Sequence, residues 1–105
     1  FTNGMLRIDY AAGCAYMNGE ELHLTPIEYK LLCLLAHNIG KVLTHTYITQ
    51  KIWGSSMESD IASLRVFMAT LRKKLEANPN SPQYIQTHIG VGYRMMKVEE
   101  PLQEL

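Results

Sequence analysis

The 105-residue sequence lacks any uninterrupted apolar run of about 18 residues, the length that a membrane-spanning helix needs. It also lacks, at its start, the basic and then apolar segment of a secretory signal. The chain opens with Phe1 rather than Met, so we expect it to be a piece of a longer protein. Disorder is a poor fit, because 47% of the residues are hydrophobic and 19% are charged. The length suits a single domain over residues 1–105, with its core at about residues 5–97.

The residue patterns of a metal site or an enzyme are missing as well. The two cysteines, Cys14 and Cys33, form no CxxC pair, which indicates a reducing compartment and buried thiols rather than a zinc site or nucleophiles. Gly90-Val91-Gly92 lacks the rest of a dinucleotide-binding motif. No acid stands at metal or triad spacing from the histidines, which are scattered along the chain at His23, His37, His45 and His88. We therefore expect no catalysis, no metal and no cofactor.

The chain as a whole has no excess of positive charge, but one segment of it does. The formal net charge is zero, yet residues 61–97 contain six Lys or Arg and one acid, Glu76, which gives +5. Residues 1–60 carry −2 and the segment from Val98 carries −3. A basic segment on a neutral chain is a local footprint for a polyanion such as nucleic acid. A solvated helix face is the alternative, and charge alone does not separate the two.

The first 24 residues predict a small antiparallel meander. Apolar and polar residues alternate over residues 6–10, which is typical of a half-buried strand. Turn signals follow at Ala12-Gly13 and Asn18-Gly19. We expect two further strands at residues 15–17 and 22–24.

Residues 25–40 predict a first helix with well-marked ends. Thr25 can cap the helix, Pro26 suits its first position, and Glu28 completes a capping box. Asn38-Ile39-Gly40 is a typical helix end.

A second and a third helix follow. Residues 42–43 are expected to be extended, and Thr44 can cap a second helix that ends where a polar loop, residues 54–60, begins. Either Ser59 or Asp60 can cap the third helix. Its apolar residues form one stripe at spacings of three and four: Ile61, Leu64, Met68, Leu71 and Leu75.

The chain then predicts a hairpin, which completes an α+β domain. Asn78-Pro79 ends the third helix. Residues 84–87 and 93–96 flank a turn that holds Gly90-Val91-Gly92.

The outward side of the third helix suits DNA. A helix that enters the major groove needs small residues for close approach, a methyl group for thymine, and cations for phosphates and base edges. A solvated face is more often dense in Glu and Lys. Such helices also serve as protein-binding faces, and the connection before this one, residues 54–60, is longer than the usual three or four residues of a helix-turn-helix. The outward side comprises Ala62, Ser63, Arg65, Val66, Ala69, Thr70 and Lys73.

Five segments resemble, in order, motifs of the OmpR/PhoB-type DNA-binding domain of bacterial two-component response regulators. They are residues 24–32 (LTPIEYKLL), 40–44 (GKVLT), 52–54 (IWG), 71–75 (LRKKL) and 90–94 (GVGYR). The resemblance runs from about Met5 to Lys97. Within the family, residues 64–68 and the Gly-Val-Gly turn look most like the potassium-responsive KdpE branch.

The resemblance implies a winged helix-turn-helix with an N-terminal antiparallel sheet, three helices and a C-terminal β-hairpin wing. The third helix would read the major groove, and the wing would touch the minor groove or its phosphates. By position, the residues that match DNA contacts or their neighbours are Thr44, Trp53, Ser63, Arg65, Val66, Ala69, Thr70, Lys73, Thr87, His88 and Ile89.

The chain departs from several relatives at three of these positions. Those relatives carry Arg where this chain has Ala69, Thr70 and Ile89, so base readout and minor-groove insertion by Arg are not expected there. The role of Arg72 remains open; a structural one, pairing with an acid near the third helix, is one possibility.

The resemblance also implies partners. A loop that some relatives use to contact RNA polymerase corresponds to Ser55, Ser56, Met57, Glu58, Ser59 and Asp60. A receiver domain, which would precede this chain in the same protein, would bear the phosphorylated Asp of the phosphorelay. We expect a cytoplasmic output domain that binds double-stranded promoter DNA, monomeric by itself and a head-to-tail dimer on a direct repeat. The alternative is a winged-helix protein-interaction module that contacts RNA polymerase or the receiver domain.

Overall fold

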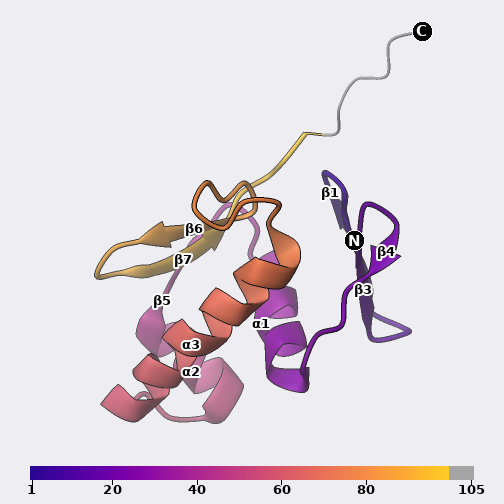
Figure 1. Ribbon diagram of the computed structural model, residues 1–105. Coiled ribbons are helices and arrows are strands. Elements are labelled where there is room, and N and C mark those ends of the chain that lie inside the picture. Colours follow the sequence, from indigo (N-terminus) through magenta and orange to yellow (C-terminus); the bar gives the residue numbers. More distant parts are fainter. Residues whose placement is uncertain (100–105) are drawn as a thin grey trace, which may run out of the picture.

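The computed structural model describes residues 1–99 and has the predicted α+β fold. Three helices lie between an N-terminal sheet and a C-terminal sheet (Figure 1). The helices α2 and α3 follow one another directly in the chain, with no strand between them.

The N-terminal sheet is the predicted antiparallel meander. It pairs in chain order, through β1 (Thr2–Asn3), β2 (Leu6–Asp9), β3 (Cys14–Met17) and β4 (Glu20–Glu21). The predicted strand at residues 22–24 is wrong. Pairing ends with the bond from the Leu22 N–H to the Ala15 carbonyl, at 2.8 Å, and the chain then runs to the cap of the first helix. Leu22 and Leu24 pack against the core from this linker.

The first two helices begin and end as the sequence predicts. In α1 (Pro26–His37), the Thr25 hydroxyl accepts from the Glu28 N–H at 3.3 Å, and the Glu28 carboxylate accepts from the Thr25 N–H at 2.8 Å. This is the expected capping box. In α2 (His45–Trp53), the Thr44 hydroxyl accepts from the Tyr47 N–H at 3.1 Å, and Gly54 ends the helix at a φ of 74°.

The third helix, α3 (Glu58–Leu75), begins before the predicted caps. Ser59 and Asp60 lie in its first turn, so the connection from α2 shortens to residues 54–57. The reason is that Asp60 caps the helix from within. Its carboxylate accepts from the Met57 N–H at 2.9 Å and from the Ser55 hydroxyl at 2.5 Å. A negative charge in the first turn also interacts favourably with the helix dipole.

The C-terminal sheet joins the predicted hairpin to an earlier strand. Its order is β5 (Val42–Thr44), β7 (Gly92–Met95) and β6 (Ile85–His88), all antiparallel. Gly92 was expected in the turn but is the first residue of β7. A Cβ atom there would lie 1.8 Å from the Leu43 carbonyl oxygen, so β5 and β7 can approach this closely only at a glycine. The hairpin β6–β7 and its turn, residues 85–95, are called the wing below.

The core lies where α3 meets the other elements. The α3 stripe is buried at Leu64, Met68, Leu71 and Leu75, while Ile61 is half-buried. These side chains share one apolar cluster with Leu6, Ile8, Ala15, Leu31, Leu32, Leu35, Ala36, Leu43, Ile48, Tyr84, Ile85, Tyr93 and Met95. The two cysteines were predicted to be buried, but both are half-exposed.

Glu76, the first residue after α3, is buried at 6% exposure and binds the start of the wing. Its carboxylate accepts from the N–H groups of Gln83, Tyr84 and Ile85 at 3.0–3.2 Å. A buried carboxylate needs such donors to offset its lost hydration. The end of the helix and the start of β6 are therefore held by one side chain.

Replacing Glu76 should loosen this junction. Glu76→Gln keeps the shape but presents an NH₂ group to backbone N–H donors, so we expect the free energy of unfolding to fall by about 2–3 kcal/mol. Urea unfolding followed by circular dichroism measures the change. Glu20→Gln, at an exposed position of β4, is the control. Equal stability of the two variants would contradict the role given to Glu76.

Candidate nucleic-acid interface

The helices α2 and α3 are joined by the short turn of a helix-turn-helix. Residues 54–57 connect them, which is the usual length for this motif. The Thr49 hydroxyl donates to the Ser56 hydroxyl at 2.9 Å, and Ser56 donates to the Thr46 carbonyl at 3.0 Å. Trp53, at the end of α2, packs on Phe67 of α3 with ring centroids 6.0 Å apart. The turn is therefore fixed by polar contacts at one end and aromatic packing at the other.

Most of the predicted contact side of α3 is exposed. Val66, for example, is 64% exposed although it is apolar. The exposed residues, called the α3 face below, are Ala62, Ser63, Arg65, Val66, Ala69 and Lys73.

Thr70 was grouped with these residues, but the structure places it differently. It is half-buried, and its hydroxyl donates to the Phe67 carbonyl within the same helix at 2.9 Å. It also lies close enough to Glu28 of α1 to help lower the pKa of that carboxyl. Thr70 therefore faces the junction with α1 more than the open side of the helix.

Lys74 and Glu28 form an ion pair that holds α3 against α1. The Lys74 Nζ lies 2.7 Å from Glu28 Oε1 and donates to the His23 carbonyl at 2.9 Å. Burial of Glu28 opposes its ionisation, but the hydrogen bonds from Lys74 and the Thr25 N–H, together with the nearby Thr70, outweigh this and lower its pKa to about 2. The Glu28 carboxylate thus serves both the α1 cap and the position of α3.

Arg72 holds the other side of α3 against the wing. Its guanidinium donates to the Thr87 hydroxyl at 2.6 Å and to the Ile85 carbonyl at 3.1 Å, and lies 5.4 Å from the centre of the Tyr93 ring. The pairing with an acid, which the sequence left open, is not a direct ion pair: within residues 1–99, no carboxylate lies within ion-pair distance of Arg72, although Glu76 is near enough for its charge to favour the charged guanidinium. Burial lowers the pKa of Arg72. Two neutral oxygens and an aromatic face contact its guanidinium, while its buried Nε has no hydrogen-bond partner among the described residues. Its role in the fold is structural.

The wing presents apolar groups rather than charge at its tip. Ile89 is 95% exposed and Val91 is 49% exposed, while Thr87 is exposed and His88 is half-buried. Residues 86–92 contain no Lys or Arg. The nearest cation on these strands, Arg94, donates to the Gln86 amide oxygen at 2.6 Å. The wing tip can therefore contact a partner through apolar surface and a hydroxyl group, but it presents no free Lys or Arg side chain.

The start of α2 lies beside the wing and contains a residue that the sequence did not single out. Thr44 is exposed and pairs with Gly92 of β7, and Thr46 is exposed in the first turn of the helix. Between them, His45 contacts the Tyr93 ring edge-on, with centroids 5.6 Å apart. Its position directly after the Thr44 cap was the available signal.

The segment expected to contact RNA polymerase is divided between the turn and the helix. Ser55 and Ser56 are half-buried, whereas Met57 is 67% exposed. Glu58 and Ser59 are exposed in the first turn of α3, and Asp60 is engaged in capping.

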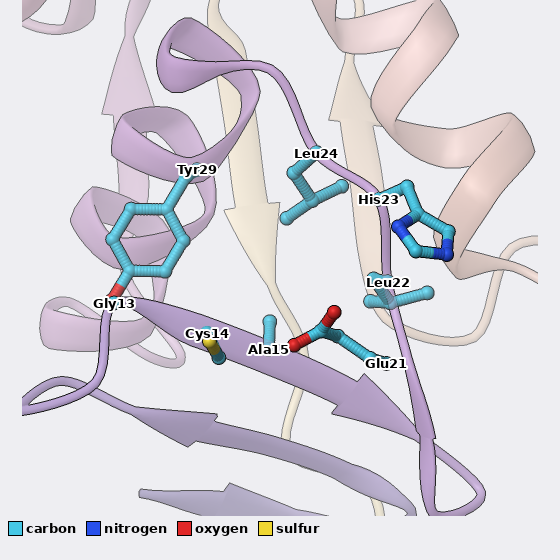
Figure 2. Close-up of a pocket in the computed structure, with 8 residues that line it drawn as sticks. All are labelled: Gly13, Cys14, Ala15, Glu21, Leu22, His23, Leu24 and Tyr29. Carbon is cyan, nitrogen blue, oxygen red and sulfur yellow. The ribbon is translucent and has the colours of Figure 1, made fainter.

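The N-terminal sheet carries a separate pocket of about 220 Å³ against α1 (Figure 2). Figure 2 shows the Glu21 carboxylate pointing toward Cys14 and Ala15, while the His23 ring points away from them. A neighbouring Glu21 raises the pKa of the Cys14 thiol, and burial raises that of Cys33, so neither is an activated nucleophile. In the part of the chain that the structure describes, no group of His, Cys, Asp or Glu is arranged to hold a metal. No helix there is long and apolar enough to cross a membrane.

Comparison with known proteins gives consistent results. The family model for the C-terminal domain of transcriptional regulatory proteins matches residues 19–95. The chain is 42% identical to the transcriptional regulatory protein KdpE of Staphylococcus aureus over 101 residues. The aligned region covers 95% of this chain and 44% of that protein. The chain thus spans less than half the length of the curated relatives that it matches.

Two solved structures share the fold. One is the response regulator DrrB, an OmpR/PhoB homologue of Thermotoga maritima, with a TM-score of 0.84, 31% identity, and coverage of 91% of this chain and 43% of that chain. The other is the RstA DNA-binding domain of Klebsiella pneumoniae in complex with the RstA box, with a TM-score of 0.85, 26% identity, and coverage of 92% and 96%.

The low pKa of Glu28 predicts a pH-dependent loss of stability. Its pKa falls from 4.5 to about 2 on folding, so its contribution is fully present above about pH 4.5 and is lost as the pH falls toward about 2. Urea unfolding between pH 7 and pH 2 should show a smaller decline for Glu28→Gln than for the unchanged chain. Glu21→Gln, at an exposed site of β4, should decline like the unchanged chain. Parallel curves for all three would show that Glu28 does not have this role.

Proposed function

The chain belongs to the family of C-terminal output domains of OmpR/PhoB-type response regulators, and from this premise we propose that it binds double-stranded DNA in a sequence-specific way. The α3 face would enter the major groove, and the wing would lie over the adjacent minor groove. The single observation that carries the proposal is the exposed α3 face. Helix α3 is held by residues 54–57 in helix-turn-helix geometry, yet leaves a side of small residues between two cations, Arg65 and Lys73, open to solvent.

The exposed residues divide into readers of bases and holders of phosphate. Val66 offers only apolar surface, which suits the methyl group of thymine. Ser63 and Ala69 are small enough to let the helix approach the base edges. Arg65 and Lys73 have long stems that reach phosphates or base edges at either side.

Phosphates are also expected at the start of α2 and at the wing. The positive end of the helix dipole at a helix N-terminus attracts anions, and the exposed hydroxyls of Thr44 and Thr46 lie at that end of α2. At the wing, Thr87, His88 and Ile89 form the tip and its approach. The last turn of α2, with Trp53, is proposed as a further backbone contact.

The proposal extends to partners of the longer protein. A two-component output domain would follow a receiver domain, act in the cytoplasm where the promoter lies, and catalyse no reaction itself. We propose that the domain is monomeric alone and that two copies sit head to tail on half-sites about one helical turn apart, which places both α3 helices on one side of the duplex.

A second function is favoured by one observation. Met57 is 67% exposed at the helix-turn-helix turn, and Glu58 and Ser59 flank it on the surface. An exposed methionine is an adaptable contact for another protein. Residues 55–60 are therefore proposed to touch RNA polymerase while α3 holds DNA. If the domain were only a protein-interaction module, it would bind polymerase or the receiver domain without any affinity for duplex DNA.

DNA binding should depend on salt, because phosphate contacts release counterions. Three to five phosphates per domain give a slope of about −3 to −4.5 in log affinity against log salt. Lys73→Ala should weaken a duplex selected from a random pool and a scrambled duplex alike, and make the slope shallower by about one unit. Lys30→Ala, exposed on α1, is the control and should change neither. A flat salt dependence in folded protein would overturn the DNA assignment.

Substitutions of Val66 and Thr70 should differ in their effect on the preference for one DNA sequence over another. Val66→Ala should relax the preference for the selected duplex over the scrambled one by about 1 kcal/mol, with the salt slope unchanged. Thr70→Ala should leave this preference unchanged, because its hydroxyl is bonded to the Phe67 carbonyl and turned toward α1. Fluorescence anisotropy with both duplexes measures both variants. A loss of preference in Thr70→Ala but not in Val66→Ala would reverse the assignment of the reader.

A further inference from the structure

His45 lies where three elements of the DNA interface meet. It is the first residue of α2, and its backbone N–H donates to the Val91 carbonyl in the wing turn at 3.0 Å. Its ring meets the edge of the Tyr93 ring of β7, with centroids 5.6 Å apart. From α3, Arg65 lies near enough to repel a positive charge on the imidazole. The fold therefore holds His45 in place through its backbone N–H and through the aromatic contact of its ring.

The surroundings of the ring contain hydroxyls and cations but no acid. Exposed Thr44 and Thr46 stand on either side of His45, with their hydroxyls 3.3 Å apart. Beyond Tyr93, the Arg72 guanidinium lies over the same aromatic ring. Within residues 1–99, no carboxylate lies within ion-pair distance of His45. The half-buried imidazole thus borders a site whose side chains suit an anion.

We propose that His45 is a phosphate-binding residue of the DNA interface and that it takes up a proton when DNA binds. This rests on the proposed function. A phosphate at the start of α2, held by the Thr44 and Thr46 hydroxyls and the helix N-terminus, would lie next to the imidazole and stabilise its charged form. Both ring nitrogens of a protonated His are donors, so the ring adds a charge-assisted hydrogen bond to the phosphate.

The free protein favours the neutral ring. Burial, and then the charge of Arg65, hold the pKa of His45 below its ordinary value of 6.5. A phosphate acts in the opposite direction, so the pKa is higher in the complex. By linkage, DNA affinity then rises as the pH falls through the range between the two pKa values, and levels off below the pKa of the free protein.

Two of the other three histidines provide matched controls, whereas His88 lies in the wing itself. His37 is exposed at the end of α1 and stacks on Tyr10 with ring centroids 4.9 Å apart. His23 is exposed on the linker before α1. Neither belongs to the α3 face or the wing.

The test measures the affinity of the folded chain for a duplex selected from a random pool, at constant salt, from pH 8 to pH 5.5. The unchanged chain and His37→Gln should bind about three- to tenfold more tightly at the acid end, since each unit of pKa difference gives up to tenfold. His45→Gln should bind with the same affinity throughout. Histidine proton signals, followed by NMR with and without duplex, should show a higher pKa for His45 in the complex and need no variant.

The outcomes separate the two proposals. Duplex binding with a flat pH profile, or with a His45 pKa that DNA does not raise, would overturn the role of His45 and leave the proposed function standing. Retention of the full pH dependence in His45→Gln would do the same. A folded chain that binds no duplex at any pH would overturn the proposed function, and this inference with it.

Discussion

The relative position of α3 and the wing depends on the Glu76 carboxylate. This buried group accepts the N–H groups of residues 83–85, and so fixes where β6 begins with respect to the end of α3. The wing is also joined to β5, where Gly92 lets β7 pass against the Leu43 carbonyl. A helix and a hairpin that are to meet neighbouring grooves of one duplex need such a fixed spacing, since a small misplacement would separate their contacts.

The charges at the end of α3 are used mainly inside the protein. Arg72 binds the wing through Thr87, and Lys74 binds α1 through Glu28. The basic segment, residues 61–97, carries +5, but it does not offer all of that charge freely to DNA. The cations that remain open on α3 are Arg65 and Lys73, with only the uncharged Val66 and Ala69 of the α3 face between them. We infer that affinity comes from a few phosphates, and preference from the shape and methyl contacts between them.

Local signals in the sequence predicted the helices and most of the strands. Contacts between residues far apart along the chain could not be predicted from it. The capping box at Thr25 and Glu28 and the apolar stripe of α3 were readable because they involve residues three or four apart. The pairing of β5 with β7 brings together residues about fifty positions apart, so His45 could not be placed beside Tyr93. Asp60 misled the prediction of the helix start, because a carboxylate that caps from the first turn looks like a cap before it. The sequence contains one signal for the role of Glu76, which is the only acid in the basic segment, residues 61–97.

Mapping the DNA contact residue by residue tests the central claim most directly. Backbone amide signals of the ¹⁵N-labelled chain would be recorded by NMR while a duplex selected from a random pool is added. The account predicts the largest changes at the α3 face, at the start of α2 and at the wing tip, including Val66, Thr44 and Ile89. Signals from the N-terminal sheet and from the pocket around Cys14 should stay in place. Changes confined to that sheet, with the α3 face unaffected, would contradict it.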